Sequence, residues 1–127
     1  MNNADTVKRV CNKYYPFIRL STKGATAICM DIVKELGLEQ GDTVSFLQNK
    51  EEPKDWYLLF GDKNGFVLRG DKKSKSLFFN QTENARIVFK SLALTCISAR
   101  FKVDTTPVEV EGMKLYAMLT LKPIIGK

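Results

Sequence analysis

The chain has 127 residues, of which 44% are apolar and 27% charged, so it holds enough apolar material for a packed core. No apolar run approaches the roughly 18 residues that a membrane-spanning helix needs, and the first residues lack the apolar core of a secretion signal. We therefore expect a cytoplasmic protein with no membrane partner. Three cysteines without a Cys-x-x-Cys pair, and no histidine, argue against a disulfide framework, a zinc site and histidine-dependent catalysis, so we expect no metal, no cofactor and no enzymatic activity.

Residues 1–13 are polar and charged without a sustained period, which predicts a flexible N-terminal arm. Strand-forming residues then alternate with turn residues, and an apolar stretch behind Asp31, a good N-cap, predicts a short helix that Gly37 ends. The elements expected in this half, in the order strand, strand, helix, strand, strand, are 14–20, 25–29, 31–36, 43–47 and 55–60.

The same order returns after the short connection 61–65, whose Asn-Gly pair is a strong turn signal. Asn80 followed by Glu83 resembles a capping box, and apolar residues at helical spacing from Ala85 to Leu92 predict a longer helix. The strands expected around this helix are 66–69, 76–79, 97–103 and 114–121.

The two halves read as two copies of one ββαββ unit, repeat 1 over 14–60 and repeat 2 over 65–121, in a single domain over 14–121. Without a gap, Phe17 falls on Phe66 at an offset of 49 residues. Self-similarity on this scale is typical of a unit that buries its apolar face only against its copy. One mismatch stands in the first strand, where Arg19 falls on Leu68, and it requires a bulge or a false match there.

Positive charge is concentrated in the hairpin and helix of each copy. Residues 1–30 carry a net charge of +4 and residues 31–65 a net charge of −4, whereas residues 66–102 carry +6 and the remainder is neutral. An anionic partner, DNA or an acidic protein, is therefore expected. The candidate nucleic-acid-binding residues are Arg19, Lys23, Arg69, Lys72, Lys73, Lys75, Arg86 and Lys90.

Part of the first copy resembles the AbrB, MazE and SpoVT family of swapped-hairpin proteins. The similar positions are Arg19-Leu20-Ser21-Thr22-Lys23-Gly24, Ile28, Asp31-Ile32, Leu36-Gly37-Leu38, Gly41-Asp42 and Val44. The family's usual glutamine, proline and arginine are replaced by Ala25, Cys29 and Val33. The resemblance implies a small β-barrel in which two units exchange hairpins and hold DNA with basic residues of the first hairpin and of the region around the helix N-terminus.

We therefore expect a mainly β protein with two short helices, a pseudo-two-fold swapped-hairpin barrel made from one chain. Such a chain is a monomeric pseudo-dimer, and further pairing into a homodimer is left open. The leading functional hypothesis is a DNA-binding transcriptional regulator, whose two basic hairpin turns project together and contact the phosphates of duplex DNA. The alternative is an antitoxin-like protein-interaction module without DNA binding. An enzyme ranks third, because the sequence shows no histidine, no set of metal ligands and no phosphate-cradling glycine loop. The acidic pairs Glu51-Glu52 and Glu109/Glu111 are interpreted as solvated charge. Trp56, Tyr57 and Tyr116 could stack on bases but are interpreted as core.

Overall fold

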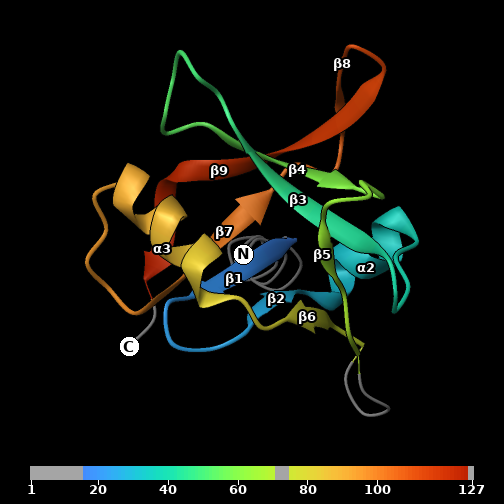
Figure 1. The fold of residues 1–127 in the computed structure, drawn as a ribbon, viewed down its shortest axis with the longest axis horizontal. Helices are drawn as coiled ribbons and strands as arrows, with labels where there is room; N and C mark the ends of the chain where they lie inside the picture. The colour runs from blue at the N-terminus through green and yellow to red at the C-terminus, as the bar shows by residue number, and fades with distance from the viewer. Residues whose placement is uncertain (1–15, 71–74, 126–127) are drawn as a thin grey trace, which may run out of the picture.

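Nine antiparallel strands and two short helices make up the described part of the chain, residues 16–70 and 75–125, in this computed structural model (Figure 1). The strands are β1 (Phe17–Ser21), β2 (Thr26–Ile28), β3 (Thr43–Gln48), β4 (Trp56–Phe60), β5 (Phe66–Val67), β6 (Leu77–Phe79), β7 (Ser98–Val103), β8 (Val108–Val110) and β9 (Met113–Ile125). The helices are α2 (Met30–Leu36) and α3 (Thr82–Ser91). The expectation of a mainly β fold with two short helices is confirmed, and the predicted N-terminal arm, 1–13, lies outside the described residues.

The strands form a nearly closed barrel. They are hydrogen-bonded in the order β5-β3-β4-β9-β7-β1-β2-β6, while β8 pairs with β9 off this path. The two ends of the order meet beyond β5, where Arg69 forms a bridge with Phe78 of β6 through reciprocal backbone bonds of 2.7 and 2.8 Å. Curling the sheet in this way satisfies backbone groups that an open edge would leave without partners.

Alternate residues of the strands point into the barrel, where they form one apolar cluster with both helices. Ile18, Leu58 and Phe101 are fully buried on three different strands. Helix α3 adds Phe89, whose ring meets Phe101 edge to face at 6.3 Å, and α2 adds Ile32. The two helices lie on opposite sides of the barrel (Figure 1), so each closes a different part of the core.

The N-cap residues of both helices differ from the predicted ones, Asp31 and Asn80. Cys29 is the N-cap of α2, because its extended backbone places its carbonyl to accept the first helical bonds, and Asp31 lies in the first turn. A carboxylate there still faces the positive end of the helix dipole. Gln81, not Asn80, is the N-cap of α3. The prediction that Gly37 ends α2 is confirmed, since it takes the left-handed conformation with φ 66°.

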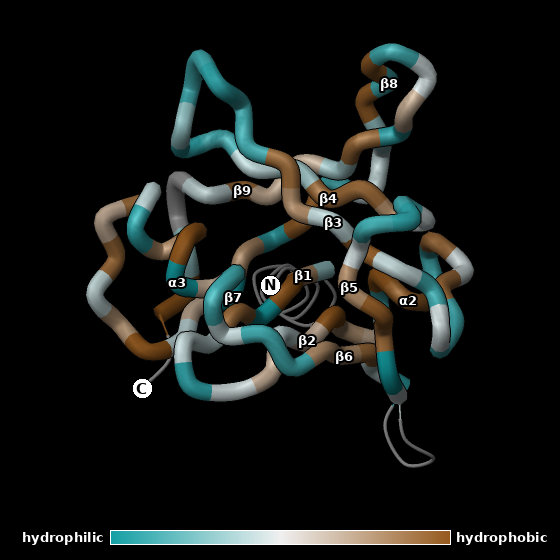
Figure 2. Tube along the Cα trace, in the orientation of Figure 1, coloured by the Kyte–Doolittle hydropathy of each residue, from teal (hydrophilic) through white to brown (hydrophobic). Residues whose placement is uncertain are grey.

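The hairpin formed by β8 and β9 was expected to be a loop followed by a shorter strand. It closes through Glu111 and Gly112, which both have positive φ, 51° and 82°, as a two-residue hairpin turn requires. It projects from the barrel on the same side as the hydrophilic loop between β3 and β4 (Figure 2). Farther along, the register between β9 and β7 shifts between Arg100 and Lys102, in a segment of β9 where Pro123 has no N–H to offer.

Candidate nucleic-acid interface

A single row of side chains crosses the outer face of four neighbouring strands, β7, β1, β2 and β6, and ends at Arg69 beyond β5. The backbone pairings that build it are Arg100 with Arg19, Arg19 with Ala27, Ala27 with Phe78, and Phe78 with Arg69. Residues paired in this way point to the same side of a sheet. We call these five residues the arginine row. Its three arginines are exposed, and Ala27 and Phe78 between them are half-buried.

Charge on this face is of one sign. The five strands β1, β2, β5, β6 and β7 contain no acidic residue. Neither Arg19 nor Arg69 has an ion-pair partner among the described residues. With adjacent strands about 4.8 Å apart, Arg100 and Arg19 are direct neighbours, and Arg19 and Arg69 are separated by three strand spacings, about 14 Å along the surface. The row is therefore a strip of positive charge open to an anion.

One arginine of the row is also held in place by an aromatic ring. The guanidinium carbon of Arg100 lies 5.3 Å from the ring centroid of Phe17, within the range of a cation–π contact. Phe17 is the outward residue two positions before Arg19 on the same strand, and it is paired with Lys102 of β7. The contact orients Arg100 without neutralising its charge.

One described lysine of each hairpin turn lies beyond the ends of the strands that carry this row. Lys23 is exposed in the turn between β1 and β2, and Lys75 is exposed at the end of the turn that leads into β6. Lys72 and Lys73 lie outside the described residues.

The strand ends to which these turns lead do not lie at one edge, contrary to the expectation that the two turns project together, although residues 71–74 of the second turn lie outside the described residues. Each turn comes just before β2 or β6, and those two strands pair in antiparallel orientation, Thr26 opposite Phe79 and Ile28 opposite Leu77. The N-terminal ends of the two strands therefore lie at opposite ends of their ladder. What lies between the turns is the arginine row.

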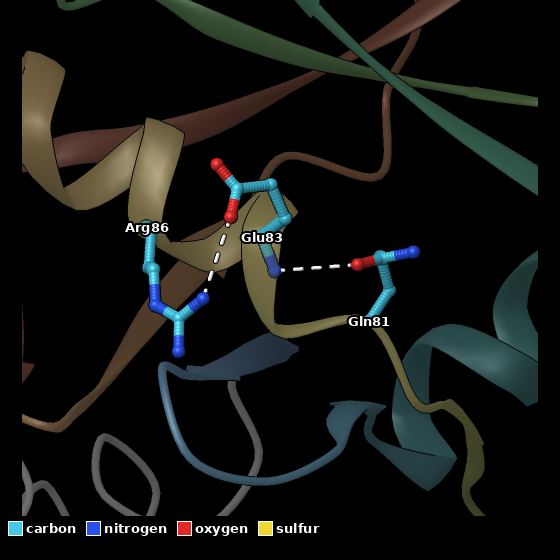
Figure 3. Close-up of polar contacts among 3 residues, drawn as sticks. All are labelled: Gln81, Glu83 and Arg86. Carbon is cyan, nitrogen blue, oxygen red and sulfur yellow. Dashed lines mark hydrogen bonds and ion pairs between the residues drawn. The ribbon is translucent and has the colours of Figure 1, made fainter.

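The two basic residues of α3 gather beside the first turn instead. Arg86 and Lys90 are both exposed, and both line a shallow hollow whose rim includes Thr22, the residue before Lys23. Figure 3 shows the side chain of Arg86 turned toward Glu83, with 3.3 Å between Nη1 and Oε1. Part of the charge of Arg86 is thus offset within α3.

Sequence reasoning missed Arg100 and Phe78 as members of the site. For Arg100 a signal was present, because the charged residues of Ser98–Val103 alternate with buried ones and so must share the outer face. For Phe78 the outward direction follows only from the register with Ala27, which is set by pairing between distant parts of the chain.

The remaining candidates do not add a site. Trp56 is 5% exposed and its indole N–H donates to Ser91 Oγ at 2.8 Å, so the interpretation of this residue as core is confirmed. The ring of Tyr116 packs against Phe60 with centroids 5.7 Å apart. The two acidic pairs, Glu51-Glu52 and Glu109/Glu111, are exposed. No group of three potential metal ligands occurs among the described residues, and neither described helix is long and apolar enough to cross a membrane.

Comparisons with known proteins give no relative. No family model matches the chain, and no curated protein or solved structure matches it either. The resemblance to the swapped-hairpin family therefore rests on the residues of the first copy named above.

Proposed function

We propose that this chain is a DNA-binding protein of the transcriptional-regulator type, which contacts the phosphate backbone through the arginine row and the basic turns on either side of it. The observation that carries the proposal is the arginine row itself: three exposed arginines at one level of the barrel, on strands without an acidic residue. Lysine and arginine bind DNA mainly by neutralising phosphates and releasing the counterions condensed on them.

We further propose that the barrel is a pseudo-two-fold, swapped-hairpin assembly of two copies within the chain. Matched strand pairings support this. Arg19 pairs with Ala27 in the first hairpin and Arg69 with Phe78 in the second, and each arginine follows a residue with no exposed surface, Ile18 or Leu68. The gap-free alignment of the two copies placed Arg19 on Leu68. Shifting the second copy by one residue places Arg19 on Arg69 and removes this mismatch.

The second half of each copy supports the same relation. Val44 pairs with Phe60 between β3 and β4, and Val103 pairs with Met118 between β7 and β9. The strands that join the copies, β2 with β6 and β4 with β9, are corresponding strands of the two units. Under this relation Arg19 and Arg69 are equivalent residues. Their separation of about 14 Å is close to the roughly 12 Å width of the DNA major groove, so they suit phosphates on its two sides.

The test is fluorescence polarisation with a labelled DNA duplex of mixed sequence at about 50 mM salt, comparing the wild type with the double variant Arg19→Ala/Arg69→Ala. Loss of two phosphate contacts reduces the slope of log Kobs against log salt by about 1.8 and weakens binding. The matched control is Lys34→Ala/Lys50→Ala, which removes the same charge from exposed positions outside the row. Failure of the wild type to bind, or an equal effect of the control, contradicts the proposal.

A second candidate is the protein-interaction module, without DNA binding. Ile124 and Ile125 at the end of β9 favour it, because they are 39% and 50% exposed and lie side by side in the sequence. A partner that co-purifies with the chain and stays bound at high salt, and that is lost in Ile124→Ser/Ile125→Ser, would select this function over the first.

A further inference from the structure

We propose that the preferred ligand of the arginine row is single-stranded DNA, with Phe78 as the platform on which a base stacks. This inference rests on the proposed function of the row and specifies the class of nucleic acid that the row binds. It adds to the phosphate contacts a residue that touches the bases.

The side chain of Phe78 points out of the barrel from a strand whose backbone is hydrogen-bonded on both sides. Its neighbours Leu77 and Phe79 are 7% and 3% exposed, so the strand turns their side chains into the barrel and the side chain of Phe78 to the outside. Its backbone is fixed on both sides, through the two short bonds to Arg69 and through the ladder with Ala27. The platform is thus set before any ligand arrives, which lowers the entropy cost of binding.

The ring of Phe78 also has no aromatic partner among the described residues. The adjacent Phe79 is engaged with two rings, stacked on Phe66 with centroids 4.5 Å apart and edge to face with Phe46 at 6.1 Å. Phe78 shares in none of the ring contacts of the described chain. On the side toward Arg19 its neighbour is Ala27, the smallest side chain of the row, which leaves room above the sheet for a planar base.

Arginines lie on both sides of Phe78, where they can contact the phosphates that flank a stacked base. Arg69 is one backbone pairing away from Phe78, and Arg19 lies two strand spacings away on the other side, about 10 Å. A strand that crosses the row would place phosphates against these guanidinium groups and an intervening base against the ring. A positive surface that follows the backbone, interrupted by aromatic rings, is the usual arrangement of proteins that bind single strands.

A duplex would make little use of this ring. In double-stranded DNA the bases are stacked inside and offer only their edges in the grooves, whereas in a single strand their faces are accessible for stacking. The position of a half-buried aromatic ring in the middle of a strip of arginines therefore favours a single strand. Stacking of one base on an aromatic side chain corresponds to about a 5- to 150-fold change in affinity when the ring is removed.

The experiment compares fluorescein-labelled dT15 with a 15-base-pair duplex by polarisation at about 50 mM salt. The variants are Phe78→Ala, Phe78→Leu, which keeps an apolar side chain but removes the ring, and Phe78→Tyr, which keeps the ring. Val67→Ala is the matched control, because Val67 is an exposed apolar residue of β5, two positions from Arg69. Thermal unfolding of each variant shows whether the barrel is intact.

We expect the wild type to bind dT15 more tightly than the duplex. Phe78→Ala and Phe78→Leu should weaken dT15 binding about 5- to 150-fold and leave duplex binding nearly unchanged. Phe78→Tyr and Val67→Ala should bind dT15 as the wild type does. If Arg19→Ala/Arg69→Ala weakens binding but Phe78→Ala does not, the stacking inference is wrong and the proposed function stands. An equal loss of both ligands in Phe78→Ala also overturns the inference. If the wild type binds neither ligand, both proposals fall.

Discussion

Arg19 and Arg69 lie three strands apart in the same outward row of the barrel, each directly after a residue with no exposed surface. Strand alternation alone turns both guanidinium groups to the outside, because Ile18 and Leu68 occupy the inner positions. The acidic pairs lie elsewhere, in the loop between β3 and β4 and in the hairpin of β8 and β9, which both project at the top of Figure 1, whereas β2 and β6 lie near its lower edge. The fold thus keeps these two acidic pairs away from the arginine row, and the predictions below test what individual residues contribute.

Arg100 is expected to act as a third phosphate contact. Arg100→Ala should reduce the slope of log Kobs against log salt by about 0.9, because one fewer counterion is released. Arg100→Lys keeps the charge and should keep the slope, although it loses the flat guanidinium that lies over Phe17. Polarisation titrations at four salt concentrations measure both slopes. An unchanged slope in Arg100→Ala would remove this residue from the interface.

Glu83→Gln is expected to strengthen DNA binding. The carboxylate of Glu83 lies 3.3 Å from Arg86, and the exposed fractions of the Arg86 and Glu83 side chains are 57% and 66%, so the pair contributes little to stability, within about 0.5 kcal/mol. Removing the carboxylate leaves the Arg86 guanidinium free to bind a phosphate and removes one negative charge that repels DNA. We estimate about a 1.5- to 5-fold gain in affinity at low salt. The amide side chain preserves helix propensity.

The control for this experiment is Glu35→Gln, which removes an exposed carboxylate from α2, on the opposite side of the barrel (Figure 1). Equal gains from the two substitutions would mean that only net charge matters. Unchanged binding by Glu83→Gln would mean that α3 does not face the DNA, and weaker binding would contradict the prediction outright.

The sequence allowed prediction of most elements but not of the pairings that build the site. Local signals were sufficient for the strands around Val44 and Leu58 and for the end of α2 at Gly37, because runs of β-branched and aromatic residues and a left-handed glycine act within a few residues. The arginine row instead depends on the pairing of Arg19 with Arg100, 81 positions away in the sequence. Strand β8 was missed because its three residues are all exposed and carry no apolar alternation toward a core.

Gly65→Ala is expected to destabilise the barrel. A Cβ at Gly65 would lie 2.9 Å from the carbonyl oxygen of Val44 and 3.0 Å from side-chain atoms of Thr43 and Ser45, so β3 must shift to accept it. We expect a loss of about 1–3 kcal/mol in the free energy of unfolding, as for other overpacked sites. Urea unfolding should show a lower midpoint with an unchanged m-value.

Gly24→Ala is the matched control for this substitution. Gly24 lies in the turn after β1, but it has no positive φ, and a Cβ there would approach nothing closer than Ser21 Oγ at 3.5 Å. Alanine should therefore be neutral or stabilise the chain by up to about 1 kcal/mol, because it restricts the unfolded state. A large loss at Gly24, or none at Gly65, would contradict this account of the two turns.

The hydrogen bond between Trp56 and Ser91 is expected to couple β4 to α3. Ser91 Oγ accepts the indole N–H at 2.8 Å and donates to the carbonyl of Val88 at 2.6 Å, so it links the sheet to the last turn of the helix. Ser91→Ala leaves a nearly buried N–H without a partner and should cost about 1–3 kcal/mol, whereas Trp56→Phe removes the donor together with part of the ring. The double variant should lose less than the sum of the two, with an interaction energy of about 1 kcal/mol measured by urea unfolding in a double-mutant cycle. Additive losses would mean that the bond contributes nothing to holding α3, and that the contact of Phe89 with Phe101 is sufficient to fix the helix.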